Sequence, residues 1–330
     1  MNSTLFQNKS VLLTGGTGSF GYQFANLVLK KYKPKRLVIF SRDELKQFEM
    51  SQHINHPNVR FFIGDVRDEG RLQRAMNVGI DIVIHAAALK QVATAEYNPI
   101  ECIKTNVLGA ENIINVSINS NVKKVIAIST DKAVNPINLY GASKLCSDKL
   151  FIAANNLSGK SGTKFSVVRY GNVVASRGSV IPFFKEQRAS GTIPITDKRM
   201  TRFWITVNQG AQFAANCSEL MQGGEIFIKK SPSMKIIDLA KAIAPECKQK
   251  EIGIRQGEKL HETMLSKSDA INTREFKQFY ITKINSGLWN KGNFVNYNRE
   301  KPKKLVDEFE YSSNTNKEWV NANQIKEFIN

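Results

Sequence analysis

The sequence has no long apolar run and few of the residues typical of secreted or metal-binding proteins. Its 330 residues include four cysteines and four histidines, and no stretch of 18 apolar residues is present that would span a bilayer. The cysteines are widely spaced and form no CxxC pair, which indicates reduced thiols, not disulfides or a zinc site. The amino terminus has no apolar core of signal-peptide length. We therefore expect a cytoplasmic protein that binds no metal and no membrane.

Acidic residues are also in the minority, with 29 against 47 lysines and arginines, which gives a formal charge of +18. Such a charge attracts polyanions, so nucleic acid has to be considered as a partner. However, the basic residues are scattered from Lys30 to Lys326 and form no stripe interleaved with aromatics. A solvated basic surface accounts for this pattern better, and we expect no nucleic-acid partner. Internal repeats are absent, which excludes a solenoid.

The first half of the chain alternates short β-branched runs with segments of helical periodicity. This alternation is typical of a parallel sheet covered by helices on both faces. Strands are predicted at residues 11–14, 37–40, 59–63, 82–85, 125–129 and 165–170. We expect a Rossmann-type, doubly wound α/β domain over residues 1–170. A smaller α/β substrate-binding domain is predicted over residues 171–330, with some of its segments returning to the first domain.

Two apolar stripes predict helices that pack on this sheet. The first consists of Phe20, Phe24, Leu27 and Val28, and the second, after Pro99, of Ile100, Ile103, Val107, Ala110 and Ile114. Beyond Gly171 the elements become shorter, with loops around several prolines. A last helix is predicted near residues 318–329.

A glycine-rich turn follows the first predicted strand directly. Residues 14–21 read TGGTGSFG, which contains the pattern G-x-G-x-x-G from Gly16 onward. Glycines at these positions permit a tight turn and a close approach of the backbone, and the following helix directs its N–H groups at a pyrophosphate. The position between a strand and an amphipathic helix indicates a dinucleotide site, in preference to an ordinary turn.

The end of the second predicted strand, Ser41-Arg42-Asp43, is where NAD and NADP are distinguished. Arg42 can stack on adenine and, together with Ser41, bind a 2′-phosphate. An acidic residue such as Asp43 is the feature that favours the free hydroxyl of NAD, but we interpret the segment as an NADP site. Residues 64–66 are expected near the adenine. The small residues 86–88 let the backbone pass beside the cofactor.

A tyrosine and a lysine, Tyr140 and Lys144, are one helical turn apart. The ammonium, with oxidised nicotinamide, is expected to lower the pKa of Tyr140 so that it accepts a proton from a sugar hydroxyl. The spacing recurs at Tyr297 and Lys301, in a polar stretch to which we assign no role. The first pair differs because it follows a predicted strand of the nucleotide-binding half.

That strand ends in Ser129-Thr130-Asp131-Lys132, which places a hydroxyl, a carboxylate and an amine at the edge of the sheet where ligands bind. A plain dehydrogenase needs only the hydroxyl. Asp131 and Lys132 supply an additional acid and base, which indicates proton transfers at carbons next to the one that is oxidised. An exposed ion pair on a loop is the alternative interpretation.

With these residues identified, the chain closely resembles the inverting UDP-N-acetylglucosamine 4,6-dehydratases, which belong to the extended short-chain dehydrogenase/reductases. The resemblance is carried by residues 14–21, 40–46 (FSRDELK), 61–68 (FFIGDVRD), 85–90 (HAAALK), 129–133 (STDKA), 169–173 (RYGNV), 200–206 (MTRFWIT) and 257–262 (GEKLHE), and residues 309–313 (FEYSS) extend it.

The resemblance implies a complete reaction, the first step of pseudaminic acid or related deoxyamino-sugar synthesis. Tyr140, held by Lys144, would deprotonate the 4-hydroxyl while hydride leaves C4 for NADP, and Thr130 would hydrogen-bond the 4-oxygen. Lys132 would remove the C5 hydrogen, and Asp131 would help the 6-hydroxyl leave as water. Hydride would return to C6, and C5 would be reprotonated from the opposite face. NADP is therefore not consumed, and a hexameric assembly is expected.

The resemblance and the motifs together give two sets of binding residues. The cofactor set is Gly15, Thr17, Gly18, Ser19, Phe20, Gly21, Ser41, Arg42, Asp43, Lys46, Asp65, Val66, Ala86, Ala87, Ala88, Lys90, Thr105, Tyr140, Lys144, Tyr170, Asn172 and Val173. The set for UDP-N-acetylglucosamine is Lys90, Lys132, Asn172, Arg177, Val180, Thr196, Met200, Arg202, Arg255 and Glu258.

Two other functions remain as alternatives. A UDP-sugar 4-epimerase or reductase of the same fold would have no evident need for Asp131 and Lys132. A cofactor-sensing or nucleic-acid-binding protein would use the positive charge, but it would have no need to keep the Tyr140–Lys144 pair, which is intact here.

Overall fold

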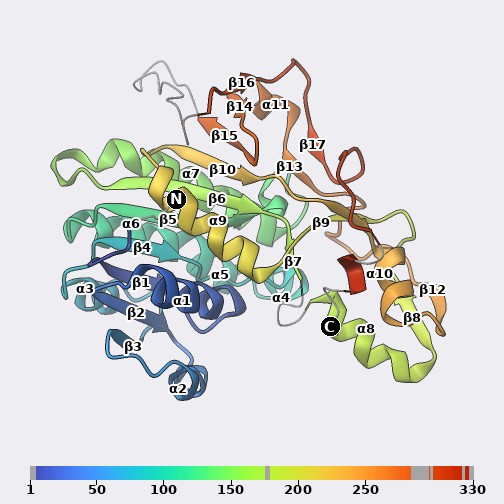
Figure 1. Cartoon of the computed structure of the whole chain (residues 1–330), viewed down its shortest axis with the longest axis horizontal. Coiled ribbons are helices and arrows are strands. Elements are labelled where there is room, and N and C mark those ends of the chain that lie inside the picture. The colour runs from blue at the N-terminus through green and yellow to red at the C-terminus, as the bar shows by residue number, and fades with distance from the viewer. Residues whose placement is uncertain (1–4, 175–178, 284–296, 298–299, 322–323, 327–330) are drawn as a thin grey trace.

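The centre of the molecule is one ten-stranded sheet with helices on both faces, seen in Figure 1. The computed structural model describes residues 5–174, 179–283, 297, 300–321 and 324–326. Six parallel strands form one side of the sheet: β1 (Ser10–Thr14), β2 (Arg36–Ser41), β3 (Val59–Ile63), β4 (Ile82–His85), β5 (Lys124–Thr130) and β6 (Lys164–Tyr170). All six predicted strands are therefore present, and the predicted fold class is confirmed.

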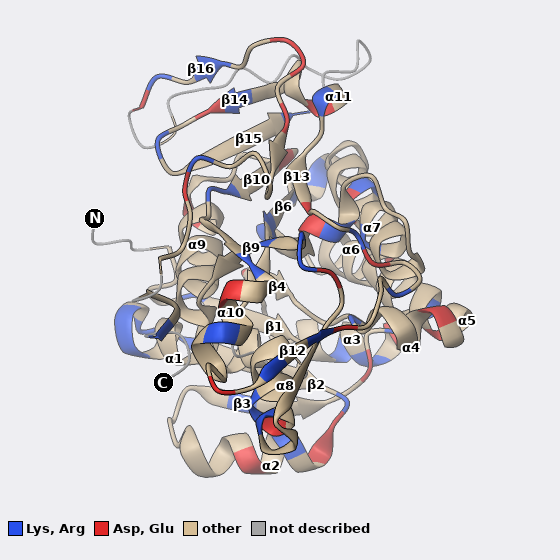
Figure 2. Cartoon of the chain, turned by 90° about the vertical axis from the view of Figure 1, so that its right-hand side faces the viewer, with Lys and Arg blue, Asp and Glu red and all other residues tan. Residues whose placement is uncertain are grey.

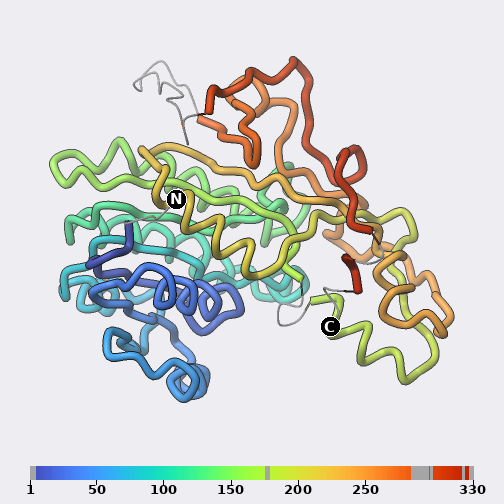
Figure 3. Tube along the Cα trace, viewed as in Figure 1, coloured from blue at the N-terminus to red at the C-terminus, as the bar shows by residue number. Residues whose placement is uncertain are grey.

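Segments from beyond residue 170 complete this sheet. The strand order is β16-β14-β15-β10-β6-β5-β4-β1-β2-β3. β10 (Glu225–Lys229) pairs parallel with β6, and β15 (Phe279–Lys283), β14 (Thr273–Glu275) and β16 (Lys303–Lys304) continue antiparallel. Figure 3 shows the chain returning from the second half to lie beside the first. The division near residue 170 stays a prediction.

The central strands are buried on both faces, and alternate residues enter two different cores. In β1, Leu12 packs into one core, and Val11 and Leu13 pack into the other. α3 (Glu69–Met76), α6 (Gly109–Asn119) and α7 (Leu139–Leu157) cover the first face. α1 (Ser19–Tyr32), α2 (Glu44–His53) and α9 (Val207–Leu220) cover the second. This two-sided burial explains why the strands read as near-continuous apolar runs.

The first predicted stripe faces the sheet as expected, because Phe24 and Val28 of α1 are fully buried. The second prediction is wrong at its start, because Ile100 is 59% exposed and Ile103 is 37% exposed. α4 (Val92–Tyr97) and α5 (Pro99–Ile103) are followed by a π-helical turn, Lys104–Leu108, before α6. The wider turn changes the face presented to the core, so residues 102, 105 and 106 point inward.

The smaller part of the molecule is built from short elements around a third core. α8 (Val180–Gln187) and α10 (Ile236–Ile243) pack on a parallel pair, β8 (Thr192–Ile195) and β12 (Lys248–Glu251). β7 (Asn172–Val173), β9 (Thr201–Ile205) and β11 (Ser233–Lys235) form a three-stranded sheet. β13 (Thr263–Leu265) pairs with β17 (Tyr311–Ser312), and α11 (Lys267–Ala270) follows β13. Figure 2 shows acidic segments in red among basic segments in blue around α8, α10 and β12.

The last predicted helix is largely wrong. Trp319 pairs with Ser233, and the backbone groups on either side of Trp319 bond to Ser233. These bonds hold the chain extended from residue 318 to 320, and within the described part of the predicted segment only residues 324–326 are helical. Tertiary pairing therefore overrides the helical pattern. No helix of the described residues is long and apolar enough to cross a membrane.

Candidate active site

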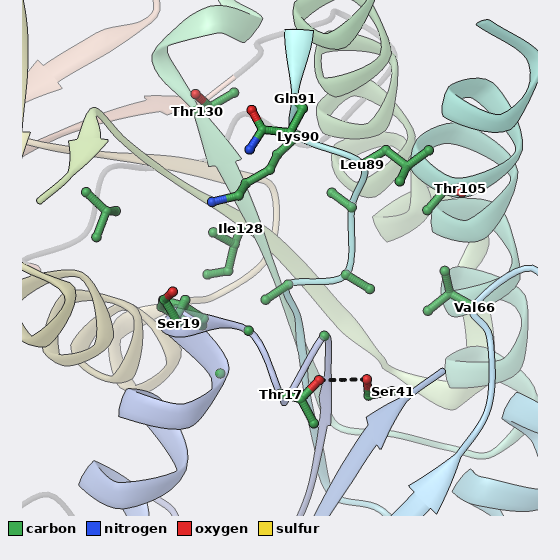
Figure 4. Close-up of a pocket in the computed structure, with 18 of the residues that line it drawn as sticks. Thr17, Ser19, Ser41, Val66, Leu89, Lys90, Gln91, Thr105, Ile128 and Thr130 are labelled. Atoms are coloured by element: carbon green, nitrogen blue, oxygen red, sulfur yellow. Dashed lines mark hydrogen bonds between the residues drawn. The ribbon is translucent and has the colours of Figure 1, made fainter. Parts of the chain in front are cut away.

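A cavity of about 590 Å³ opens at the carboxyl ends of the parallel strands. Figure 4 shows Thr17 and Ser41 at one end and Lys90 and Thr130 at the other. Every residue of the predicted cofactor set lines this one cavity. Gly64, expected near the adenine, also lines the cavity. Further lining residues, for which the sequence predicted no contact with a ligand, are Phe40, Leu89, Gln91, Ile128, Ser129, Gly171 and Ser179.

The glycine-rich turn leaves no room for side chains. Gly15 has φ +64°, and a Cβ on it would lie 2.8 Å from the backbone carbon of Ala86. A Cβ on Gly21 would lie 2.4 Å from the Gly16 carbonyl oxygen. Gly18 caps α1 without a side-chain hydrogen bond, so the first N–H groups of the helix face the cavity side of the turn. The turn is suited to a phosphate.

At the end of β2, the Asp43 carboxylate is bound by residues of the following helix. Its carboxylate caps α2 by accepting a hydrogen bond from the Lys46 amide at 3.0 Å, and it forms an ion pair with the Lys46 ammonium. Ser41 Oγ lies 2.8 Å from Thr17 Oγ1, as drawn in Figure 4. Arg42 Nη1 lies 3.6 Å from Asp65 Oδ2. The carboxylate that would have favoured NAD is thus engaged by its own helix.

Two buried polar residues that the sequence analysis missed fix the loops around the cavity. The His85 ring nitrogen Nδ1 lies 2.8 Å from Thr14 Oγ1, and the same Thr14 hydroxyl accepts hydrogen bonds from the amides of Ala86 and Ala87. Burial, aided by the charge of Lys144, lowers the pKa of His85 to about 3. His85 is therefore neutral, and it orients the small-residue loop through Thr14.

Asn106 is the second missed residue, and it lies in the π-helical turn. Its Oδ1 accepts a hydrogen bond from the Leu89 amide at 2.8 Å, and its Nδ2 donates to the Leu89 carbonyl at 2.9 Å. Nδ2 also donates to Ser143 Oγ at 2.9 Å, which ties α7 to the same loop. The π-helical turn, which also interrupts the second predicted apolar stripe, thus places Asn106 behind the cavity. π-turns are often found at functional sites.

Tyr140 and Lys144 lie on the first turns of α7, and Asn138 caps the helix by accepting from the Gly141 amide at 2.7 Å. Burial raises the pKa of Tyr140 to about 12, against the opposing charge of Lys132 and a hydrogen bond with Thr130. The predicted lowering of this pKa by Lys144 is therefore wrong for the protein alone. Burial also lowers the pKa of Lys144, and the charge of Asp148 opposes that effect.

Thr130, Asp131 and Lys132 meet Tyr140 at the carboxyl end of β5. Thr130 Oγ1 donates to Asp131 Oδ1 at 3.0 Å, and Lys132 Nζ donates to the same oxygen at 3.0 Å. Lys132 Nζ also lies 3.3 Å from Glu262 Oε1. Burial acts to lower the pKa of Lys132, but the charges of Asp131 and Glu262 outweigh it and raise the pKa above its usual range.

The cavity side of this cluster is formed by Thr130, Lys132, Tyr140 and Lys144, all of which line it. Asp131 is fully buried behind them and does not reach the cavity wall. The predicted alternative of an exposed ion pair is wrong, because the Asp131 side chain is fully buried and the Lys132 side chain is only 21% exposed.

Only some of the predicted substrate residues line the cavity. Lys90, Lys132 and Asn172 line the cavity. Arg177 lies outside the described residues. The other six, which do not line the cavity, are Val180, Thr196, Met200, Arg202, Arg255 and Glu258.

Arg202 and Met200 are buried, and this explains their absence from the wall of the cavity. The Arg202 guanidinium donates to the carbonyls of Thr201, Leu260 and Lys259, and the Met200 side chain lies in the core of the smaller part. Arg202 thus organises the 257–262 loop, a role that its position in the sequence did not indicate. Arg255, just before this loop, pairs with Glu258 of the loop at 3.0 Å.

Comparisons with known proteins extend over nearly the whole chain. Residues 11–284 match the family described as polysaccharide biosynthesis protein. The chain is 54% identical to the UDP-N-acetylglucosamine 4,6-dehydratase (inverting) of Campylobacter jejuni subsp. jejuni, over 99% of this chain and 98% of that protein. It is 40% identical to a UDP-glucose 4-epimerase of Rickettsia conorii, over 98% and 96%.

A solved structure is also similar to this chain over nearly its whole length. The X-ray structure of Pen from Bacillus thuringiensis aligns with a TM-score of 0.88 at 35% identity and covers 98% of each chain. These similarities confirm the resemblance that the sequence motifs predicted. They leave the role of each residue to be argued from the geometry of the cavity.

Proposed function

From the premise that the chain belongs to the polysaccharide biosynthesis protein family, we propose that it is an NADP-dependent UDP-N-acetylglucosamine 4,6-dehydratase that inverts C5. One observation supports the proposal most. Lys132, which pairs with the buried Asp131, lines the same cavity as Tyr140 and the glycine-rich turn. An oxidoreductase alone needs Tyr140 and Lys144, whereas loss of water needs a further acid and base.

The residues present fit a nicotinamide dinucleotide. The glycine turn suits the pyrophosphate, and Ser41, Arg42 and Thr17 suit a 2′-phosphate, because Asp43 is engaged with α2. Among the described residues, Thr105 Oγ1 and Asn172 Oδ1 are buried in the cavity wall without a hydrogen-bond partner, as expected of groups that await a ligand. When bound, NADP would accept hydride from C4 and later return it to C6.

The oxidation is assigned to one helix. Tyr140 would take the proton of the 4-hydroxyl, and Thr130 would hydrogen-bond the same oxygen. Because burial raises the pKa of Tyr140 to about 12, the ionised phenol has to be stabilised by positive charge. Lys132 supplies part of that charge, and Lys144, buried one turn along α7, is the residue we assign to the remainder.

The elimination is assigned to the adjacent turn. Once C4 is a ketone, the C5 hydrogen is acidic and Lys132 would remove it. Asp131 lies behind the cavity wall, so it would assist the departure of the 6-hydroxyl through Thr130 and Lys132, the wall residues that donate to its Oδ1. The proton from O4 and the hydroxyl from C6 together account for one water. C5 would then be protonated from the opposite face. The reaction is that of a hydro-lyase, in which hydride only moves from C4 to C6.

The proposal extends to the setting of the enzyme. The product would be UDP-2-acetamido-2,6-dideoxy-β-L-arabino-hex-4-ulose, a precursor for pseudaminic acid or a related deoxyamino sugar. We propose a cytoplasmic homohexamer, as the resemblance of the sequence motifs to this family implies. Gel filtration with light scattering tests the assembly.

The competing function is a 4-epimerase, which the 40% identity to the Rickettsia protein favours. Incubation with UDP-N-acetylglucosamine in deuterated water separates the two. The dehydratase gives a 4-keto-6-deoxy sugar with deuterium at C5 and consumes no added NADPH. A 4-epimer that retains its 6-hydroxyl and its C5 hydrogen, unaffected by Lys132→Ala, would establish the epimerase instead. Stoichiometric loss of NADPH would indicate a reductase.

A further inference from the structure

Glu262 is a buried carboxylate that the reaction described above does not use. Its side chain is about 3% exposed, and its Oε1 lies 3.3 Å from Lys132 Nζ and 3.9 Å from Arg202 Nε. Within the described part of the chain, Oε2 has no hydrogen-bond partner, and the same is true of Asp131 Oδ2. Lys132 therefore lies between two carboxylates, each with one unsatisfied oxygen.

Segments far apart in the sequence hold Glu262 in this position. Its amide donates to Ser313 Oγ at 2.9 Å, and its carbonyl accepts from the Ser313 amide at 2.8 Å. Arg202 donates to the carbonyls of Leu260 and Lys259 just before it. A buried carboxylate costs free energy unless it is paired, and one partner of Glu262 is Lys132, which lines the cavity. The anchoring thus points to a task at Lys132.

The charged groups around Lys132 oppose the removal of the C5 proton that we assign to this residue. To accept the C5 proton, the amine must be neutral, yet the nearby anions favour the ammonium. The charged and titratable groups around it are Asp131 on its own turn, Glu262 and Lys259 in the 257–262 loop, Arg202 on β9 and Tyr140 on α7. Deprotonation to bulk water is therefore unfavourable. The ammonium needs a neighbouring proton acceptor.

We propose that Glu262 is a positioning residue that holds Lys132 at the cavity wall and takes up the proton that its ammonium must release. An N–H bond of Lys132 breaks as an O–H bond forms on Glu262, and the freed lone pair then bonds the hydrogen leaving C5. The Lys132–Glu262 pair thereby gains one proton, which it returns to solvent before the next turnover. C5 is protonated separately, from the opposite face.

This inference rests on the proposed function, and single-turnover experiments with UDP-N-acetylglucosamine in deuterated water separate the two. Absorbance of the reduced nicotinamide follows the oxidation at C4, and proton NMR follows deuterium at C5. We expect Glu262→Gln to keep the oxidation but to slow deuterium incorporation about 100-fold. The residual rate should rise with pH, because bulk water must now take the proton, whereas the wild-type rate stays flat. Glu262→Asp, which keeps a carboxylate, should recover part of the rate.

Glu225→Gln is the matched control, because Glu225 is also a buried carboxylate paired with a lysine, Lys283, at 3.1 Å, but it does not line the cavity. It should lose thermal stability and keep the wild-type pH profile. A wild-type rate and pH profile in Glu262→Gln, or equal losses of oxidation and exchange, would overturn the inference alone. Wild-type protein that neither reduces its cofactor nor exchanges C5 would overturn the proposed function with it.

Discussion

The two modules of the candidate site differ in how they are assembled. Tyr140 and Lys144 come from consecutive turns of one helix, α7. The Lys132 cluster is assembled from β5 and its following turn, from β9 and from the 257–262 loop, which are up to 132 residues apart in the chain. The first module is thus set by local geometry. The second exists only when the two halves of the molecule are packed together.

This difference separates the two halves of the proposed reaction. Oxidation at C4 depends on the module that any short-chain dehydrogenase needs, whereas loss of water depends on the assembled one. Variants in the two modules should therefore stop the reaction at different points. The following predictions test that separation.

The largest effect is expected for Tyr140→Phe. Without the phenol, no group at that position accepts the 4-hydroxyl proton, so oxidation and all later steps should fall about 1,000-fold. Cofactor reduction in a single turnover measures the first step. The matched control is Tyr297→Phe, in the second Tyr-x-x-x-Lys. Tyr297 is buried and donates to Glu225 at 2.7 Å away from the cavity, so its loss should lower the melting temperature but not the rate. Oxidation at wild-type speed in Tyr140→Phe would remove the phenol from the mechanism.

Lys132→Gln should separate the modules most clearly. Oxidation at C4 should persist at a reduced rate, because Tyr140 loses part of the charge that favours its ionised form. Deuterium incorporation at C5 and release of water should fall further, about 100-fold, because the base is missing. Some loss of stability is expected, since Asp131 and Glu262 lose the cation they share. Lys124→Gln, at the other end of β5, is the control, because Lys124 donates to the Ser218 carbonyl outside the cavity. Equal loss of both steps in Lys132→Gln would mean that the two modules are not separable.

The difference between local and long-range assembly also explains which features could be predicted from the sequence. The parallel strands, the glycine turn and the Tyr140–Lys144 pair are local patterns, and every residue of the predicted cofactor set lines the cavity. Glu262 was part of a recognised motif, yet nothing nearby in the chain shows that it faces Lys132. Arg202 was expected to bind substrate because arginine suits a diphosphate, but burial directs it to backbone carbonyls.

Other differences have the same physical origin. The π-helical turn at Lys104–Leu108 breaks the 3.6-residue period on which the second stripe was predicted, so Ile100 and Ile103 are exposed. The pKa of Tyr140 was expected to fall because of Lys144 and oxidised nicotinamide. In the protein alone, the cost of burial, which depends on tertiary packing, is the larger effect. Spacing along the chain carries neither kind of information.

A smaller effect is expected for Arg42→Ala, at the nucleotide end of the cavity. Loss of a charged hydrogen bond to a 2′-phosphate should weaken NADP binding about 30-fold. NAD binding, which loses only the stacking of Arg42 on adenine, should weaken much less. Fluorescence titration with both cofactors measures the ratio. Arg36→Ala, at the start of the same strand, is the control because Arg36 donates to the Val78 carbonyl away from the cavity. An unchanged ratio in Arg42→Ala would favour NAD.

The smallest effect concerns His85, which orients the cofactor loop through Thr14. Because burial lowers its pKa to about 3, the unfolded chain binds a proton below about pH 6.5 that the folded protein does not. Stability therefore falls as the pH falls, and His85 should account for about 0.7 kcal/mol of the free energy of unfolding lost between pH 7 and pH 6. Urea unfolding at both pH values measures this slope, which His85→Gln should flatten and the exposed His53→Gln should leave unchanged. An identical slope in His85→Gln would show that the buried ring does not resist protonation.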